Sequence, residues 1–173
     1  KHVLCEKPMT MNAEQTRTAF DAAEAKGLLL VEAVWMRWHP RMRRIADLAH
    51  SGELGSMTGF EGRFTWTEAE AAPPGNYRFF PEHGGGALLD LGVYPLHALV
   101  ASVPDPMKLE VTASSRHLNE HGADLTTDIT LTWGENSTAE VTASFEQLET
   151  ESMRITFQNG EISSLDNEAY ASW

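Results

Sequence analysis

Three titratable side chains near the middle of the chain could carry out proton chemistry. Asp90, Tyr94 and His97 follow a triple glycine at residues 84–86. On a helix, this spacing places a carboxylate, a phenol and an imidazole along one side. Leucines and valines surround them, and polar groups buried in such a helix are costly unless they find partners. The three residues therefore form either a hydrogen-bonded core cluster or a catalytic group, and the pattern leaves both open.

Lys7 is a second candidate, because Glu6-Lys7-Pro8 comes just after a short apolar run typical of a parallel strand. Ligands of open α/β sheets bind at the carboxyl ends of the strands. The proline that follows Lys7 holds it in an extended conformation. An ammonium beside a phenol favours the phenolate, so Lys7 and Tyr94 together could move a proton at an alcohol or carbonyl oxygen. Asp90 would orient the lysine. The alternative is a solvated lysine at the end of a strand.

Neither a nucleophilic thiol nor a metal site is indicated. Cys5 is the only cysteine, so it cannot form an internal disulfide, and it has no histidine partner nearby in sequence; a structural thiol in a reducing compartment is expected. The histidines show no HExxH spacing, so no metal is predicted. The triple glycine at 84–86 lacks the third glycine of a dinucleotide fingerprint, which favours close backbone packing at a helix start.

The N-terminal elements predict the end of a parallel sheet. A strand at 2–6, a helix over 13–26 capped by Asn12, and a strand at 28–33 form a crossover unit. Such a unit normally needs further strands before it, so we expect the chain to begin inside a domain. A second helix is predicted at 40–50, where a proline opens the first turn.

The remaining chain predicts a sheet and one buried helix. We expect a strand at 57–66, an extended loop over 68–81, and an apolar helix over 87–103 that Pro95 distorts. From residue 109 onward, alternating polar and apolar residues predict a meander of antiparallel strands that reaches a turn at Asn159-Gly160. The polar, threonine-rich face of these strands would meet water or a hydrophilic partner surface.

Composition limits the classes of function. The chain has 173 residues, 42% of them hydrophobic and 22% charged, as in soluble globular proteins. Its net charge of −12 argues against binding nucleic acid or an anionic membrane surface. Residues 1–50 carry eight basic and six acidic side chains, so the excess of acid lies in the rest of the chain. Small molecules or proteins remain as partners, and no membrane segment is expected.

Three segments together resemble the family of glucose–fructose oxidoreductase, inositol dehydrogenase and MocA. They are Glu6-Lys7-Pro8, the stretch EAVWMRWHP at 32–40, and GGGALLDLGVYPLH at 84–97. The resemblance implies an α/β (α+β) fold in which residues 1–35 are the C-terminal part of a Rossmann dinucleotide-binding domain. Residues 36–173 would form a substrate and oligomerisation domain, incomplete at its end, on an open and mainly antiparallel sheet. A fragment lacking most of the Rossmann domain is thus expected.

The same resemblance implies an NAD- or NADP-dependent dehydrogenase that acts on a sugar, a polyol or a dihydrodiol. Tyrosine at 94, where many members have histidine, is similar to the branch of dimeric dihydrodiol dehydrogenases, xylose dehydrogenases and glucose–fructose oxidoreductase. His97 departs from the Asp or Asn that many members carry there. The implied catalytic residues are Lys7, Asp90 and Tyr94; the implied cofactor contacts are Glu6, Lys7, Trp35 and Arg37; the implied substrate contacts are Asp90, His97 and Arg78.

Two other functions remain open at this point. One is a non-catalytic relative that binds a nucleotide or sugar, and the other is a cofactor-retaining lyase or glycosidase. The expected location is the cytoplasm, and the expected partner is a second copy of the protein, in a homodimer or homotetramer joined through the open sheet face. The 173-residue chain by itself is expected to fold in part and not to turn over.

Overall fold

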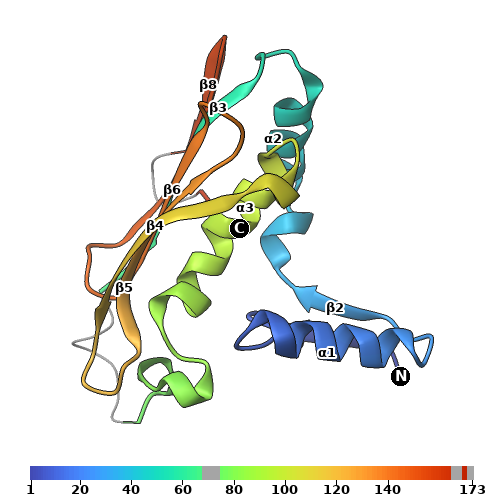
Figure 1. The fold of residues 1–173 in the computed structure, drawn as a ribbon, viewed down its shortest axis with the longest axis vertical. Helices are drawn as coiled ribbons and strands as arrows, with labels where there is room; N and C mark the ends of the chain where they lie inside the picture. The colour runs from blue at the N-terminus through green and yellow to red at the C-terminus, as the bar shows by residue number, and fades with distance from the viewer. Residues whose placement is uncertain (68–74, 165–168, 171–173) are drawn as a thin grey trace.

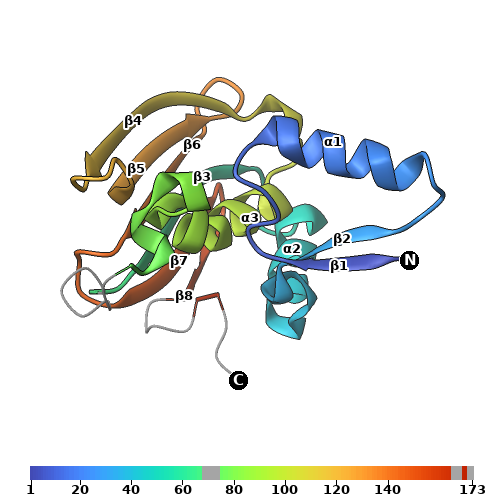
Figure 2. The ribbon, with the colours of Figure 1, turned by 90° about the horizontal axis from the view of Figure 1, so that it is seen from below.

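The computed structural model describes residues 1–67, 75–164 and 169–170, and these form two units (Figure 1). The smaller unit contains two parallel strands and one helix. The larger unit is a six-stranded sheet with helices against one face, as a view from below also shows (Figure 2). The α/β (α+β) class with an open, largely antiparallel sheet is confirmed. The first part of the loop expected over 68–81 lies outside the described residues.

The smaller unit is the predicted crossover. Strand β1 (Val3–Glu6) pairs in parallel with β2 (Leu30–Ala33), and α1 (Ala13–Glu24) connects them. The Asn12 side chain caps α1 by accepting the Gln15 backbone N–H at 2.9 Å, which satisfies one of the donors that a helix start leaves open. The three elements agree with the predicted order, and each is a few residues shorter than predicted.

A short turn and a second helix lead into the larger unit. The 3₁₀ turn η1 (Trp35–Trp38) follows β2 directly, and α2 (Pro40–Ser51) begins with proline in its first turn. Gly52 ends α2 in the left-handed conformation at φ 79°, which glycine adopts without steric cost. Helix α2 buries Met42 and Ile45 against the core. The predicted helix at 40–50 is therefore confirmed.

The six-stranded sheet has the order β4-β5-β6-β3-β7-β8. The predicted plain meander is wrong at one place, because β3 lies between β6 and β7 and runs parallel to β6. Alternation of polar and apolar residues along β6 and β7 assigns their faces but not their neighbours, and β3 pairs with residues about 80 to 100 positions later in the chain. The strands are β3 (Met57–Thr65), β4 (Glu110–Leu118), β5 (Asp124–Thr132), β6 (Thr138–Ser144), β7 (Thr150–Phe157) and β8 (Gly160–Ser164).

The β7–β8 hairpin lies close to its predicted position. Phe157 pairs with Gly160, so Gln158 and Asn159 make the two-residue connection. The turn is thus displaced by one residue from the Asn159-Gly160 pair that the sequence favours. Hairpin loops of two residues are common because they match the twist of the strands.

The buried helix expected over 87–103 consists of two parts. A π-helical turn, Leu88–Gly92, precedes α3, Val93–Ser102. Pro95 has no N–H to donate to the carbonyl of Leu91, so a regular α-helical ladder cannot run through this segment. The expected distortion is therefore present and lies just before the proline, as in other helices with an interrupted ladder.

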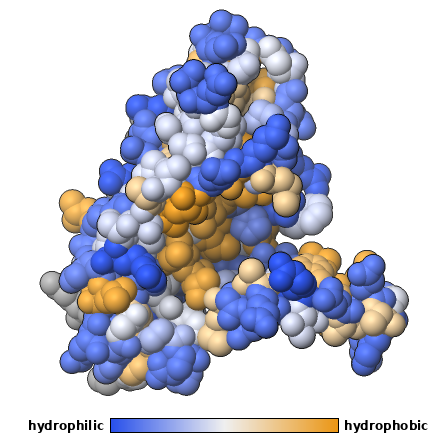
Figure 3. All heavy atoms as spheres, viewed as in Figure 1, coloured by the Kyte–Doolittle hydropathy of each residue, from blue (hydrophilic) through white to orange (hydrophobic). Residues whose placement is uncertain are grey.

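The segment Pro81–Ser102 is also long and apolar enough to cross a membrane, judged by length and composition alone. In this structure, 56% of its most apolar window is buried inside the protein. It packs on the sheet, and hydrophobic side chains gather in the hollow at the centre of the face that Figure 3 shows. The core that it completes includes Phe60, Leu91, Leu99, Val141, Phe145, Met153 and Ile155.

Helix α3 approaches the sheet closely at Gly62 of β3. A Cβ atom there would lie 2.8 Å from Cβ of Pro95 and 2.6 Å from the Phe60 ring. We expect Gly62→Ala to lower the free energy of unfolding by about 1–3 kcal/mol, the usual cost of overpacking. Urea titration followed by circular dichroism measures it.

Gly59→Ala is the matched control on the same strand. Its added Cβ would meet only the Thr156 side chain, at 3.4 Å or more, so the change should stay within about 0.5 kcal/mol. Equal losses in both variants would contradict the close approach of α3 to β3.

Candidate active site

The carboxylate of Asp90 lies where the two units meet, and Lys7 reaches it from the smaller unit. The Lys7 Nζ donates to Asp90 Oδ1 at 3.0 Å and to the Asp90 backbone carbonyl at 2.8 Å. The two side chains are 16% and 10% exposed, respectively. Residues 83 positions apart in sequence are thus joined in a partly desolvated ion pair. The predicted contact between Lys7 and Asp90 is present.

A second cation binds the other oxygen of the same carboxylate. Arg78, in the 3₁₀ turn η2 (Tyr77–Phe79), donates from Nε to Asp90 Oδ2 at 2.7 Å. The Asn76 side chain caps this turn by accepting the Arg78 backbone N–H at 3.1 Å. Asp90 is therefore an acceptor for two positively charged donors, an arrangement that compensates its burial.

Tyr94 lies one helical turn beyond Asp90 and is 7% exposed. Its hydroxyl accepts a hydrogen bond from the Trp35 indole Nε1 at 3.2 Å. The Lys7 ammonium lies over the face of the phenol ring, 4.9 Å from its centre, in a cation–π contact. The sequence predicts the lysine beside the tyrosine; the structure places it against the ring and leaves the hydroxyl to Trp35. Because the indole only donates, the hydroxyl keeps its own proton for donation.

His97, the third residue of the predicted stripe, has a different partner. Its Nε2 lies 3.4 Å from Glu32 Oε2 at the end of β2, and Glu32 Oε1 also accepts the Met9 backbone N–H at 2.9 Å. Burial lowers the pKa of His97 below its usual value; Glu32 opposes this shift, and Arg37 adds to it. His97 therefore links α3 to the smaller unit through Glu32.

The predicted cofactor contacts are divided between the two sides of this junction. Trp35 packs edge-on against Tyr94, with ring centres 5.8 Å apart. Glu6 is exposed at the end of β1, and Arg37 is exposed on η1 and faces a pocket beside His97. Lys7 and Trp35 are thus in contact with the central cluster, whereas Glu6 and Arg37 lie at its edge.

Aromatic side chains close the sheet side of Tyr94. The rings of Phe64 and Tyr170 have their centres 5.1 and 6.5 Å from that of Tyr94. Burial raises the pKa of Tyr170, whose hydroxyl donates to the Ser152 carbonyl at 2.7 Å. Burial also raises the pKa of Glu151, which faces Phe64 across the β3–β7 pair. Aromatic rings therefore enclose the side of Tyr94 that faces the sheet.

Asp124 supports the site and was missed by sequence reasoning. Its Oδ2, at the start of β5, accepts the Leu88 backbone N–H at 2.8 Å and the Thr127 hydroxyl at 2.7 Å. It thereby caps the helical segment that carries Asp90 and Tyr94. The only sequence signal was an acidic residue after a glycine turn, and nothing local relates it to a helix start 36 positions earlier.

Asp124 also explains why the turn before this helix is rich in glycine. A Cβ at Gly86 would lie 2.0 Å from Asp124 Oδ1, and one at Gly85 would lie 2.6 Å from the Arg78 carbonyl. The Gly86 N–H donates to that same carbonyl at 2.8 Å. The prediction of close backbone packing at the triple glycine is confirmed, and this packing fixes Arg78 beside Asp90.

These features are those of a two-part α/β protein with a polar cluster at the junction of its parts. Residues 42–163 match the family described as the GFO/IDH/MocA C-terminal domain. The chain belongs to the GFO/IDH/MocA family, as the three sequence segments predict.

Individual relatives agree with this assignment. The chain is 33% identical over 163 residues to D-xylose 1-dehydrogenase (NADP(+)) 2 of Haloferax volcanii, covering 93% of this chain and 48% of that protein. It is 33% identical over 162 residues to dTDP-3,4-didehydro-2,6-dideoxy-alpha-D-glucose 3-reductase of Actinomadura kijaniata, with coverages of 94% and 48%. The chain thus spans about half the length of the curated relatives it matches.

A solved structure has the same fold. The 3-ketoreductase from Actinomadura kijaniata in complex with NADP and TDP-benzene superimposes with a TM-score of 0.78 at 28% identity. The match covers 95% of this chain and 57% of that one.

We expect Asp124→Ala to lower the free energy of unfolding by about 1–3 kcal/mol, because the Leu88 N–H loses its acceptor in a part-buried place. Hydrogen exchange at the Leu88 amide should also become faster. Asp128→Ala on the same strand is the control, since Asp128 is exposed and accepts from the hydroxyl groups of Ser115 and Thr142. Unchanged exchange at Leu88 in Asp124→Ala would contradict the cap.

His97 should make the protein less stable in acid. The pKa of His97 is lower in the folded state than in the unfolded state. Between these two pKa values the unfolded state binds more protons, so the free energy of unfolding falls as the pH drops below about 6.5. Urea titrations at pH 7.5 and 5.5 should show a larger loss for the wild type than for His97→Gln. Equal losses would contradict the lowered pKa.

Proposed function

We propose that the full-length protein is an NAD- or NADP-dependent oxidoreductase that transfers hydride between its cofactor and a carbinol carbon of a sugar, polyol or dihydrodiol. The observation that carries the proposal is the meeting of Lys7, Asp90 and Tyr94 at the junction of the two units. Relatives named as xylose dehydrogenase, ketoreductase and trans-1,2-dihydrobenzene-1,2-diol dehydrogenase support the reaction class. An intact proton-transfer cluster weighs against a purely binding role.

The donor groups present fit the nicotinamide end of such a cofactor. Lys7 lies past the carboxyl end of a parallel strand, the edge at which dinucleotides bind, and the Trp35 ring offers a flat apolar wall beside Tyr94. In the proposal, Lys7 and Trp35 hold the nicotinamide riboside, with Glu6 and Arg37 at the edge, and residues 1–35 belong to the cofactor domain. The bound cofactor supplies the hydride acceptor or donor.

The chain's own residues handle the proton. Tyr94 is the acid and base, because its hydroxyl retains a proton and its only described partner is a donor. Asp90 accepts hydrogen bonds from two of the three N–H groups of the Lys7 ammonium. These bonds orient the ammonium and leave its third N–H for a substrate or ribose oxygen. Arg78 and His97 border the cluster and are the proposed substrate contacts, together with Asp90.

We also propose a homodimer or homotetramer, joined through the open face of the sheet, in the cytoplasm. Hydroxyl groups and charged side chains lie on this face: Thr142 donates to Asp128 at 2.8 Å, and Arg154 lies 3.9 Å from Glu61. Polar side chains of this kind supply the hydrogen bonds and the polar rim of protein interfaces. The free thiol of Cys5 agrees with a reducing compartment.

Tyr94→Phe in the full-length protein should lower turnover by about 10²–10⁴-fold, the usual contribution of an acid–base group. The assay follows NADP reduction at 340 nm with D-xylose and with trans-1,2-dihydrobenzene-1,2-diol as substrates. Tyr77→Phe is the matched control, because Tyr77 is 51% exposed.

Turnover that survives in Tyr94→Phe would remove Tyr94 from the proton step. Cofactor binding without reduction by any sugar or diol would refute the oxidoreductase. Product formation without net change in the cofactor would instead favour a cofactor-retaining lyase or glycosidase.

A further inference from the structure

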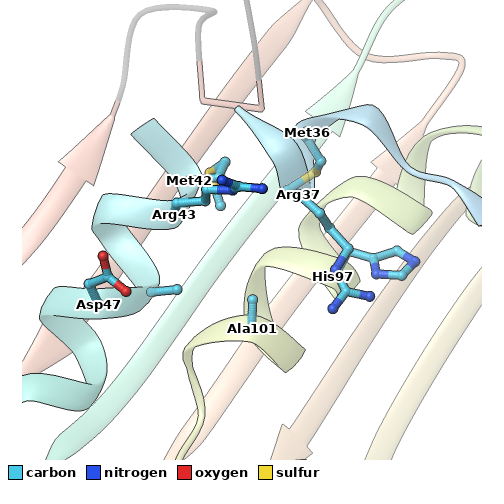
Figure 4. Close-up of a pocket in the computed structure, with 8 residues that line it drawn as sticks. Met36, Arg37, Met42, Arg43, Asp47, His97 and Ala101 are labelled. Carbon is cyan, nitrogen blue, oxygen red and sulfur yellow. The ribbon is translucent and has the colours of Figure 1, made fainter. Parts of the chain in front are cut away.

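A pocket lies between η1, α2 and α3, and its lining includes Arg37 and His97, which are proposed above to border the cofactor and the substrate (Figure 4). Its volume is about 360 Å³, within the range of small-molecule sites. Figure 4 shows Arg43 and Asp47 entering from α2, with Arg37 and His97 on the opposite side. The side chains of Met36 and Met42 also line it.

The pocket is positively charged, whereas the chain as a whole is negatively charged. The chain as a whole has a net charge of −12, yet two guanidinium groups face this space and Asp47 is the single carboxylate among the lining residues. Among the described residues, neither Arg37 nor Arg43 forms an ion pair with a carboxylate. Unpaired guanidinium groups are the usual partners of phosphate and similar anions.

The position of Arg43 is defined by packing. Its guanidinium carbon lies 5.2 Å from the centre of the Trp38 ring, in a cation–π contact. A stacked guanidinium keeps its edge donors free for hydrogen bonds, and it loses less side-chain entropy when it binds. The Trp38 ring therefore restricts the positions that the Arg43 guanidinium adopts.

The floor of the pocket is apolar. Met36 and Met42 are 1% and 4% exposed, so both thioethers are fixed in the core. A charged ligand resting on such a floor is shielded from water on one side, which strengthens its attraction to the guanidinium groups. Both arginines and this floor line the same pocket.

His97 closes the inner end of the pocket and is sensitive to its charge. The groups facing its imidazole are Glu32 from β2 and Arg37 from η1; Arg43 and Asp47 face the same pocket from α2. An anion bound between the arginines would counter their charge and favour the imidazolium form. By linkage, the anion then binds more tightly when His97 is protonated.

We propose that this pocket binds a tetrahedral dianion, the phosphate or diphosphate group of a small-molecule ligand, between Arg37, Arg43 and His97. The site lies one turn of α3 beyond Tyr94, on the Glu32 side of the helix. A nucleoside diphosphate carries the required group. The site shares Arg37 and His97 with the proposed function, but anion binding is measured without turnover, so failure of one proposal is distinguishable from failure of the other.

Isothermal titration of the chain with sodium sulfate at low ionic strength tests the site. Sulfate keeps its charge between pH 6 and 8, so any change in affinity reports on the protein. We expect saturable one-to-one binding that weakens at least about tenfold in Arg37→Gln and in Arg43→Gln, the effect of losing a charge-assisted hydrogen bond. Both side chains are exposed, so neither change should prevent folding.

Arg44→Gln is the matched control, since Arg44 is exposed on the same helix and does not line the pocket. It should change the affinity less than twofold. Wild-type binding should be tighter at pH 6 than at pH 8, and His97→Gln should remove this difference. Absence of saturable binding, or equal weakening by Arg44→Gln, would overturn the site.

A further titration identifies the source of the anion. Binding of dTDP, lost in Arg43→Gln, would assign the site to a nucleoside diphosphate. Sulfate binding without binding of dTDP would assign it to a different phosphorylated ligand, and the site itself would stand.

Discussion

The shared carboxylate of Asp90 is the interaction on which this structure depends. Lys7 approaches it from the parallel unit and Arg78 from the turn beside the triple glycine. A carboxylate with 10% exposure is costly to bury unless it is fully hydrogen-bonded. Because the two cations come from different parts of the chain, satisfying Asp90 also fixes how the crossover unit lies against the sheet.

Several local features position this carboxylate. Asp124 caps the segment that carries it, and the glycine turn lets the backbone pass beside both Asp124 and Arg78. The π-helical turn over Leu88–Gly92 adjoins Pro95 and leads into α3, where Tyr94 meets Lys7. Close backbone contacts thus concentrate around one ion pair.

Much of the fold and of the cluster could be predicted from sequence, because periodicity and capping are local. The helix capped at Asn12, the helix opened by Pro40 and the alternating strands of the sheet required no distant information. Insertion of β3 beside β6 depends on pairing between residues some 80 positions apart, and nothing local encodes it. For the same reason, sequence missed Asp124 and the Glu32–His97 contact, and it could not show that Lys7 faces the Tyr94 ring.

Lys7 and Asp90 act as one unit that joins the two parts of the chain. A double-mutant cycle with Lys7→Met, Asp90→Asn and the combined variant measures this directly through the free energy of unfolding in urea. The structure predicts a coupling energy of about 1–3 kcal/mol, as for residues in direct contact. Additive effects of the two substitutions, within about 0.3 kcal/mol, would contradict it.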